Sequence, residues 1–178
     1  MRFALLHTIT AACSTSAKHD DGAPMPKPPL PPEGSGSQTA TPTAPSQTVY
    51  LSSPKGDVPV TVEVVATEPK IEKGLMFRQH LPLDAGMLFM MGFEKDWNFW
   101  MRNTLIPLDM IFIAKDMTIA GIVENAEPLT ETPLRHVGKP SLYVLEVNGG
   151  WTASNSIVAG ANVRFENIDP TLGARTPD

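Results

Sequence analysis

The chain has 178 residues, a net charge of −5 and a sequence pI near 5.3. This length allows one domain with extensions or two very small domains. Because the chain is acidic and has no basic run, we expect no nucleic-acid partner. The only cysteine is Cys13, which excludes a disulfide within the chain and a zinc site built from cysteine pairs.

The first 13 residues have the outline of an export signal. Met1-Arg2 precede a short, mostly apolar run that ends in the small residues Ala11 and Ala12. The sequence Thr10-Ala11-Ala12-Cys13 resembles a bacterial lipobox, in which the cysteine is lipidated and becomes the new N-terminus. We therefore predict an exported protein held by Cys13 on the periplasmic face of a membrane, with other export routes and a cytosolic protein as alternatives.

Residues 14–47 are predicted to be a disordered tether. Large apolar side chains are nearly absent, so the segment cannot bury enough surface to offset chain entropy. Eight prolines favour extended polyproline II structure and a semi-rigid spacer: Pro24, Pro26, Pro28, Pro29, Pro31, Pro32, Pro42 and Pro45.

Residues 48–169 carry strand and helix signals, and we expect residues 170–178 to be a frayed tail. Alternating or continuous apolar runs predict strands at 58–64, 86–91, 98–102, 108–113, 118–123 and 142–147, with a last strand near Val163 and Phe165. Thr67-Glu68-Pro69 predicts a helix start, and one helical turn is expected at 151–156. These elements indicate a mainly β fold, a single compact antiparallel β sandwich or small barrel with one or two short helices.

The centre of the pattern is the stretch from Phe99 to Ile113. Two strand-like runs flank a hinge at 103–107, and polar side chains gather within a few residues of it. This arrangement predicts a defined polar site on a β scaffold.

Several short motifs resemble the domain-of-unknown-function family 192. They are Gly74-Leu75-Met76-Phe77-Arg78, Gly86-Met87-Leu88-Phe89, Phe99-Trp100-Met101-Arg102-Asn103-Thr104 with Pro107-Leu108-Asp109, Glu131-Thr132-Pro133, Tyr143-Val144-Leu145-Glu146-Val147-Asn148 and Gly150-Trp151. In order, they cover about residues 58–167. The family often has Lys at the place of Arg102 and Ala at that of Gly149. The resemblance implies a compact, mainly β domain that is often exported, and it brings no established activity, cofactor or catalytic residue.

A polar and aromatic cluster has three open interpretations. One is a groove for a small polar ligand such as a sugar or peptide fragment, since Trp faces offer flat apolar area and Asn, Asp and Arg fix hydroxyls or carboxylates. Another is structural, with Asp109 binding turn amides or pairing with an arginine. The third is a hydrolase-like pair of Asp109 and Glu146. The candidate residues are Arg78, Trp100, Arg102, Asn103, Thr104, Asp109, Glu146, Asn148 and Trp151.

We expect no cofactor and no metal site. The four histidines, His7, His19, His80 and His136, show no ligand spacing. Most of the nine methionines lie in apolar strands, which favours core packing over Cu(I) binding. The sequence therefore predicts a monomeric binding or accessory module of the cell envelope, with an envelope hydrolase as the alternative.

Overall fold

The computed structural model describes residues 45–173. The predicted signal segment, the lipidation site at Cys13 and nearly all of the predicted tether lie outside these residues, as does the end of the predicted tail.

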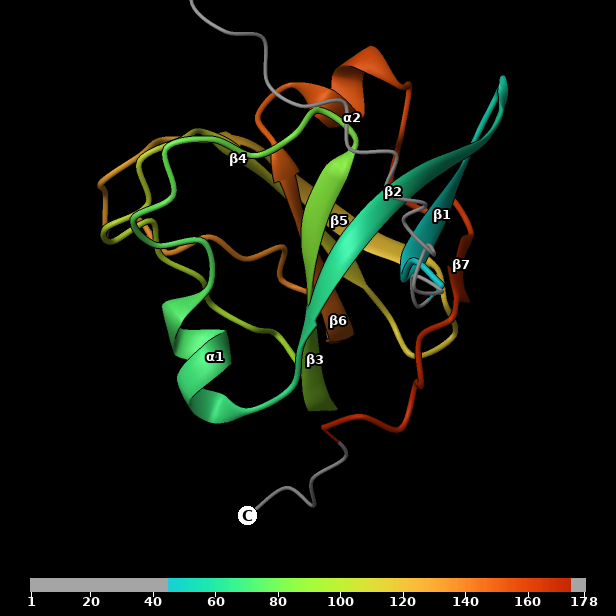
Figure 1. The fold of residues 1–178 in the computed structure, drawn as a ribbon, viewed down its shortest axis with the longest axis horizontal. Coiled ribbons are helices and arrows are strands. Elements are labelled where there is room, and N and C mark those ends of the chain that lie inside the picture. The colour runs from blue at the N-terminus through green and yellow to red at the C-terminus, as the bar shows by residue number, and fades with distance from the viewer. Residues whose placement is uncertain (1–44, 174–178) are drawn as a thin grey trace, which may run out of the picture. The chain divides into compact units, whose positions relative to one another are not determined.

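A single curled sheet, open like half of a barrel, forms the domain (Figure 1). The strand order is β5-β4-β6-β3-β2-β1-β7. The strands are β1 (Thr48–Ser53), β2 (Gly56–Val65), β3 (Ala85–Lys95), β4 (Leu108–Ile113), β5 (Ile119–Ala126), β6 (Ser141–Asn148) and β7 (Val163–Glu166). Two short helices, α1 (Glu68–Lys73) and α2 (Trp151–Ser154), complete it. The predicted mainly β domain with one or two short helices is confirmed.

One strand pair departs from the antiparallel pattern. Strands β2 and β3 run parallel, with Val62 opposite Gly86, because the connection between them crosses over through α1. Thr67 is the N-cap of this helix and Pro69 lies in its first turn, while Gly74 ends it with a φ of 45°. Gly86 is required for close packing, since a Cβ there would lie 2.6 Å from the carbonyl oxygen of Glu146.

The sheet is buried on both faces. One face holds a core that includes Leu51, Val60 and Leu145 and is closed by Trp151 of α2. The other face holds a core of Phe89, Met101, Met110 and Phe112 beneath α1. All six residues of β4 are buried, so a polar side chain on this strand must find its partners inside the protein.

Two features of the strand prediction are corrected. Residues 98–102 are not a strand: Phe99 forms an isolated bridge with Arg135, and the ring of Phe99 packs edge-on against Phe89 and Phe112. These aromatic contacts fix the segment across the core without a strand ladder beside it. Strand β1 was missed, although its β-branched and aromatic residues precede a turn and pair with β2 as a hairpin.

Candidate functional site

Asp109 is the most tightly held polar side chain of the domain. It is 0% exposed on the buried strand β4. Its Oδ1 accepts hydrogen bonds from the amides of Asn125 (2.8 Å) and Gly150 (2.9 Å). Its Oδ2 accepts from the amide of Thr152 (2.8 Å) and from the Thr152 hydroxyl (2.6 Å). Four donors satisfy a carboxylate that would otherwise be costly to bury.

Three of these donors are backbone amides that no strand ladder satisfies. Asn125 lies at a register shift between β4 and β5 and has a φ of 48°, as expected for the extra residue of a β-bulge. Gly150 has a φ of 80° and precedes α2. Asp109 therefore joins the bulge of β5 to the start of α2, and so fixes the position of Trp151 between Gly150 and Thr152.

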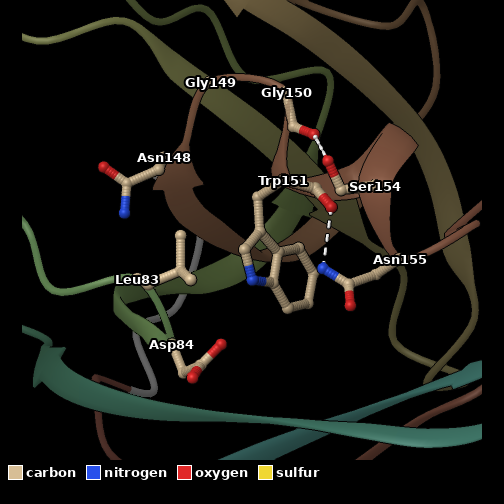
Figure 2. Close-up of a pocket in the computed structure, with 8 residues that line it drawn as sticks. All are labelled: Leu83, Asp84, Asn148, Gly149, Gly150, Trp151, Ser154 and Asn155. Atoms are coloured by element: carbon tan, nitrogen blue, oxygen red, sulfur yellow. Dashed lines mark hydrogen bonds between the residues drawn. The ribbon is translucent and has the colours of Figure 1, made fainter.

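A pocket of about 420 Å³ opens beside this turn (Figure 2). It is lined by Leu83, Asp84, Asn148, Gly149, Gly150, Trp151, Ser154 and Asn155. Hydrogen bonds hold its polar walls in place. Asn148 Nδ2 donates to the carbonyls of Leu81 and Pro82, both at 3.1 Å. Asn155 Nδ2 donates to the Trp151 carbonyl at 2.9 Å.

Some polar groups of the pocket have no partner of their own. Trp151 is 4% exposed, and no hydrogen bond from its indole N–H occurs within residues 45–173. Figure 2 shows this nitrogen on the side of the ring that faces Leu83. The carboxylate of Asp84 and the side-chain oxygens of Asn148 and Asn155 add acceptors around it.

Glu146 is a second buried carboxyl, on the neighbouring strand β6. It is 4% exposed, and within the described residues its side chain makes no hydrogen bond or ion pair. Desolvation by burial raises the pKa of Glu146 to about 8. The carboxyl reaches a small pocket of about 30 Å³ lined also by Thr104, Phe99, Trp100 and residues of α1.

Asp109 and Glu146 lie on opposite faces of the sheet. Residues directly opposite each other on paired strands share a face, and Glu146 is opposite Met110 while Asp109 is opposite Val147. Successive side chains point to opposite faces. The two carboxyls therefore do not form the pair that the hydrolase alternative requires.

The other site residues predicted from the sequence lie at the Trp151 pocket, at the Glu146 pocket or on the surface. Trp100 is 38% exposed, and the Arg102 guanidinium lies 4.1 Å from the centre of its ring. The Asn103 carbonyl accepts a hydrogen bond from the Phe77 amide at 2.7 Å. Thr104 is buried beside the Glu146 pocket.

The proposed arginine partner of Asp109 was wrong. Arg78 forms a two-pronged ion pair with Glu63, with one contact at 2.7 Å. Hydrogen bonds from Arg78 lower the pKa of Glu63. Arg102 lies 3.8 Å from Glu72. Of the two structural alternatives, binding of turn amides by Asp109 is confirmed and pairing with an arginine is not.

Of the eight residues that line the Trp151 pocket, the sequence-based candidates include only Asn148 and Trp151. The six that were missed are Leu83, Asp84, Gly149, Gly150, Ser154 and Asn155. The Gly149-Gly150 turn before a short helical segment was a signal for Ser154 and Asn155. Nothing local indicated Leu83 or Asp84, which precede β3 and reach the turn only through the sheet order.

Within residues 45–173, no group of three or more His, Cys, Asp and Glu residues is placed to hold a metal ion. In the same part of the chain, the helices are too short or too polar to cross a membrane.

A family model matches residues 50–165, which is most of the chain, and its description is DUF192, an uncharacterized ACR family. The chain belongs to the DUF192 family. The match includes the strand that carries Asp109, the strand that carries Glu146 and the turn at Trp151.

Two solved structures resemble this DUF192 chain. One is a protein of Sinorhizobium meliloti 1021 that has been suggested to be a transcription regulator; it is 36% identical with a TM-score of 0.64, and the match covers 68% of this chain and 94% of that one. The other is a protein of unknown function from Novosphingobium aromaticivorans DSM 12444. It is 38% identical with a TM-score of 0.63, and the match covers 66% of this chain and 83% of that one. No curated protein matches.

Substitution of Asp109 tests the amide network of this DUF192 domain. Asp109→Ala leaves four buried donors without an acceptor, so we expect a loss of unfolding free energy on the order of 4 kcal/mol. Asp109→Asn keeps one acceptor oxygen and should lose about half as much. Urea denaturation measures both. Arg102→Ala is the control and should cost less than about 1 kcal/mol; a loss in Asp109→Ala no larger than that of the control would contradict the role of the amide network.

The pKa of Glu146 predicts how stability depends on pH. The folded protein keeps the Glu146 proton up to about pH 8, whereas the unfolded chain loses it near the ordinary value of about 4.3. Between these values the folded state binds more protons, so stability falls as pH rises. Relative to Glu146→Gln, which does not titrate, wild type should lose on the order of 4 kcal/mol from pH 5 to pH 8. Parallel curves for the two proteins would show that burial does not raise the pKa of Glu146.

Proposed function

We propose that this domain is a binding module for a small, uncharged, hydroxyl-rich ligand such as a saccharide unit, held in the pocket beside Trp151. The observation that carries the proposal is the unpartnered indole N–H of a buried tryptophan on the wall of this pocket. The indole N–H has no acceptor within the described residues, so a ligand hydroxyl could accept its hydrogen bond without displacing a protein group.

The chemistry of the pocket favours hydroxyls over anions. The indole donates, while Asp84, Asn148 and Asn155 offer acceptor oxygens on the walls around it. Sugar hydroxyls both donate and accept, so they match this mixture. The Asp84 carboxylate would repel a ligand carboxylate or phosphate.

Rigid support is the second argument. The turn that carries Trp151 is fixed through Asp109, and Asn148 is fixed by two carbonyl contacts. A site whose walls are held before the ligand arrives loses little entropy on binding.

The three tryptophans, Trp97, Trp100 and Trp151, allow a direct test. Each gives one indole N–H signal in a ¹H–¹⁵N correlation spectrum. Titration with N-acetylglucosamine should shift the Trp151 signal and leave those of Trp97 and Trp100 unchanged. Trp151→Phe removes the donor and should weaken binding at least tenfold, whereas Trp100→Phe is the matched control.

A Trp151 signal that is unmoved by N-acetylglucosamine, glucose and glycerol at about 50 mM would contradict the proposal; these high concentrations detect Kd values in the range of weak single-sugar sites. Equal shifts of all three indole signals would indicate non-specific binding and would also contradict it.

We also propose that the domain acts at the cell envelope, tethered through Cys13. The support is the sequence Thr10-Ala11-Ala12-Cys13 after a short apolar run, followed by a proline-rich segment. Wild type should fractionate with membranes and Cys13→Ser should not, as an immunoblot of membrane and soluble fractions would show. Equal membrane association of the two proteins would remove the anchor from the account.

A further inference from the structure

We infer that the Glu146 carboxyl is a receptor for a primary ammonium group, and that the carbon chain of this amine lies in the groove between α1 and residues 97–100. This site lies on the other face of the sheet from the one that holds Asp109, and it does not depend on the saccharide proposal.

The first argument is the state of Glu146 in the empty protein. Its carboxyl is buried between Met87 of β3 and Met110 of β4, the residues opposite it in the ladders. Neither methionine offers a strong hydrogen-bond donor. Thr104, the nearest buried hydroxyl of the pocket wall, is at best weakly engaged with the Arg102 carbonyl, at 3.5 Å. The carboxyl therefore has no partner among residues 45–173, and the pocket beside it leaves room for a ligand group or water.

The second argument is the shape of the space above Glu146. The pocket at the carboxyl is about 30 Å³, which is room for one or two atoms of water size. An adjoining groove of about 210 Å³ shares four lining residues with it: Ile71, Glu72, Phe99 and Trp100. Met91 and Trp97 continue its apolar wall.

A narrow polar end joined to a wider apolar groove fits an alkylamine. The ammonium group is compact, and one or two of its three N–H donors can point at the carboxylate. A guanidinium is a broad planar fork and is too large for the inner pocket. The aromatic residues Phe99 and Trp100 line the route from the groove to the carboxyl.

The charged side chains around the pocket do not pair with the Glu146 carboxyl, so the position beside it is open to the cation of a ligand. Helix α1 contributes Glu72 and Lys73 to the wall. Arg102 lies over the Trp100 ring and 3.8 Å from Glu72, so its charge is directed to the rim. The flanking strands β3 and β4 contribute only methionines opposite Glu146. Thus no cation among the described residues reaches the carboxyl.

Binding is coupled to the loss of one proton. The empty site holds a neutral carboxyl below about pH 8. When the ammonium enters, the Glu146 proton leaves to solvent and the carboxylate pairs with the ammonium. Because the amine stays protonated to about pH 10, the affinity should rise about tenfold per pH unit between pH 5 and pH 8 and then level off.

The experiment is a titration of the whole protein with n-butylamine at pH 5, 6, 7 and 8. The indole signal of Trp100 reports occupancy, and the signal of Trp151 is the internal control. We expect the affinity to rise at least a hundredfold across this range. Glu146→Gln preserves shape and should bind at least tenfold more weakly at pH 8, with no pH dependence.

Glu72→Gln is the matched control for the rim, because it removes an exposed negative charge from the same pocket wall. It should change affinity by less than threefold and keep the dependence on pH. n-Butylguanidine and n-butanol test the fit of the head group, and both should bind at least tenfold more weakly than n-butylamine at pH 8.

Three results would overturn the inference. The first is no shift of the Trp100 signal by n-butylamine at 50 mM and pH 8, which would leave a pocket that holds water alone. The second is equal binding by wild type and Glu146→Gln. The third is tighter binding of butyramide at pH 5 than of n-butylamine at pH 8, which would make Glu146 a neutral donor to carbonyl ligands.

Discussion

The hydrogen bonds of Asp109 join three parts of the chain that no strand ladder connects. A single carboxylate binds the bulge of β5, the turn after β6 and the first residues of α2. Each of these places has backbone amides that the sheet leaves without a partner, and buried amides without partners are costly. The carboxylate is costly to bury alone for the same reason. The amides supply the donors that the carboxylate needs, and the carboxylate supplies the acceptors that the amides need. The result is a rigid turn that holds Trp151 and the walls of its pocket in place.

The second buried carboxyl shows the opposite arrangement. Glu146 lies one strand away from Asp109, yet the alternation of β4 and β6 places it on the other face of the sheet. There it meets methionines and aromatic rings instead of amides. Asp109 supplies stability, whereas Glu146 keeps unused capacity for a partner. The sheet thus separates the two carboxyls, although they lie on paired strands, and each belongs to a different site.

The sequence predicted the elements better than their arrangement. Alternating valines at 58–64 and the apolar runs at 108–113 and 142–147 correspond to β2, β4 and β6, because burial of one or both faces leaves a local pattern. The parallel neighbours β2 and β3 could not be predicted, since periodicity does not name a partner strand. The partners of Asp109 were out of reach too, as its donors lie 16, 41 and 43 residues away. The strand prediction for residues 98–102 was wrong because buried aromatic residues in a loop can give the same apolar pattern as a strand.

Amide hydrogen exchange in the native protein tests the central role of Asp109 most directly. The amides of Asn125, Gly150 and Thr152 lie in a bulge, a turn and a four-residue helix, where exchange is ordinarily fast. If Asp109 holds them, all three should exchange as slowly as the central amides of β4 and β6, and together. Exchange of these three amides as fast as that of the exposed loop residue Val158, whose amide makes no hydrogen bond within residues 45–173, would contradict the account.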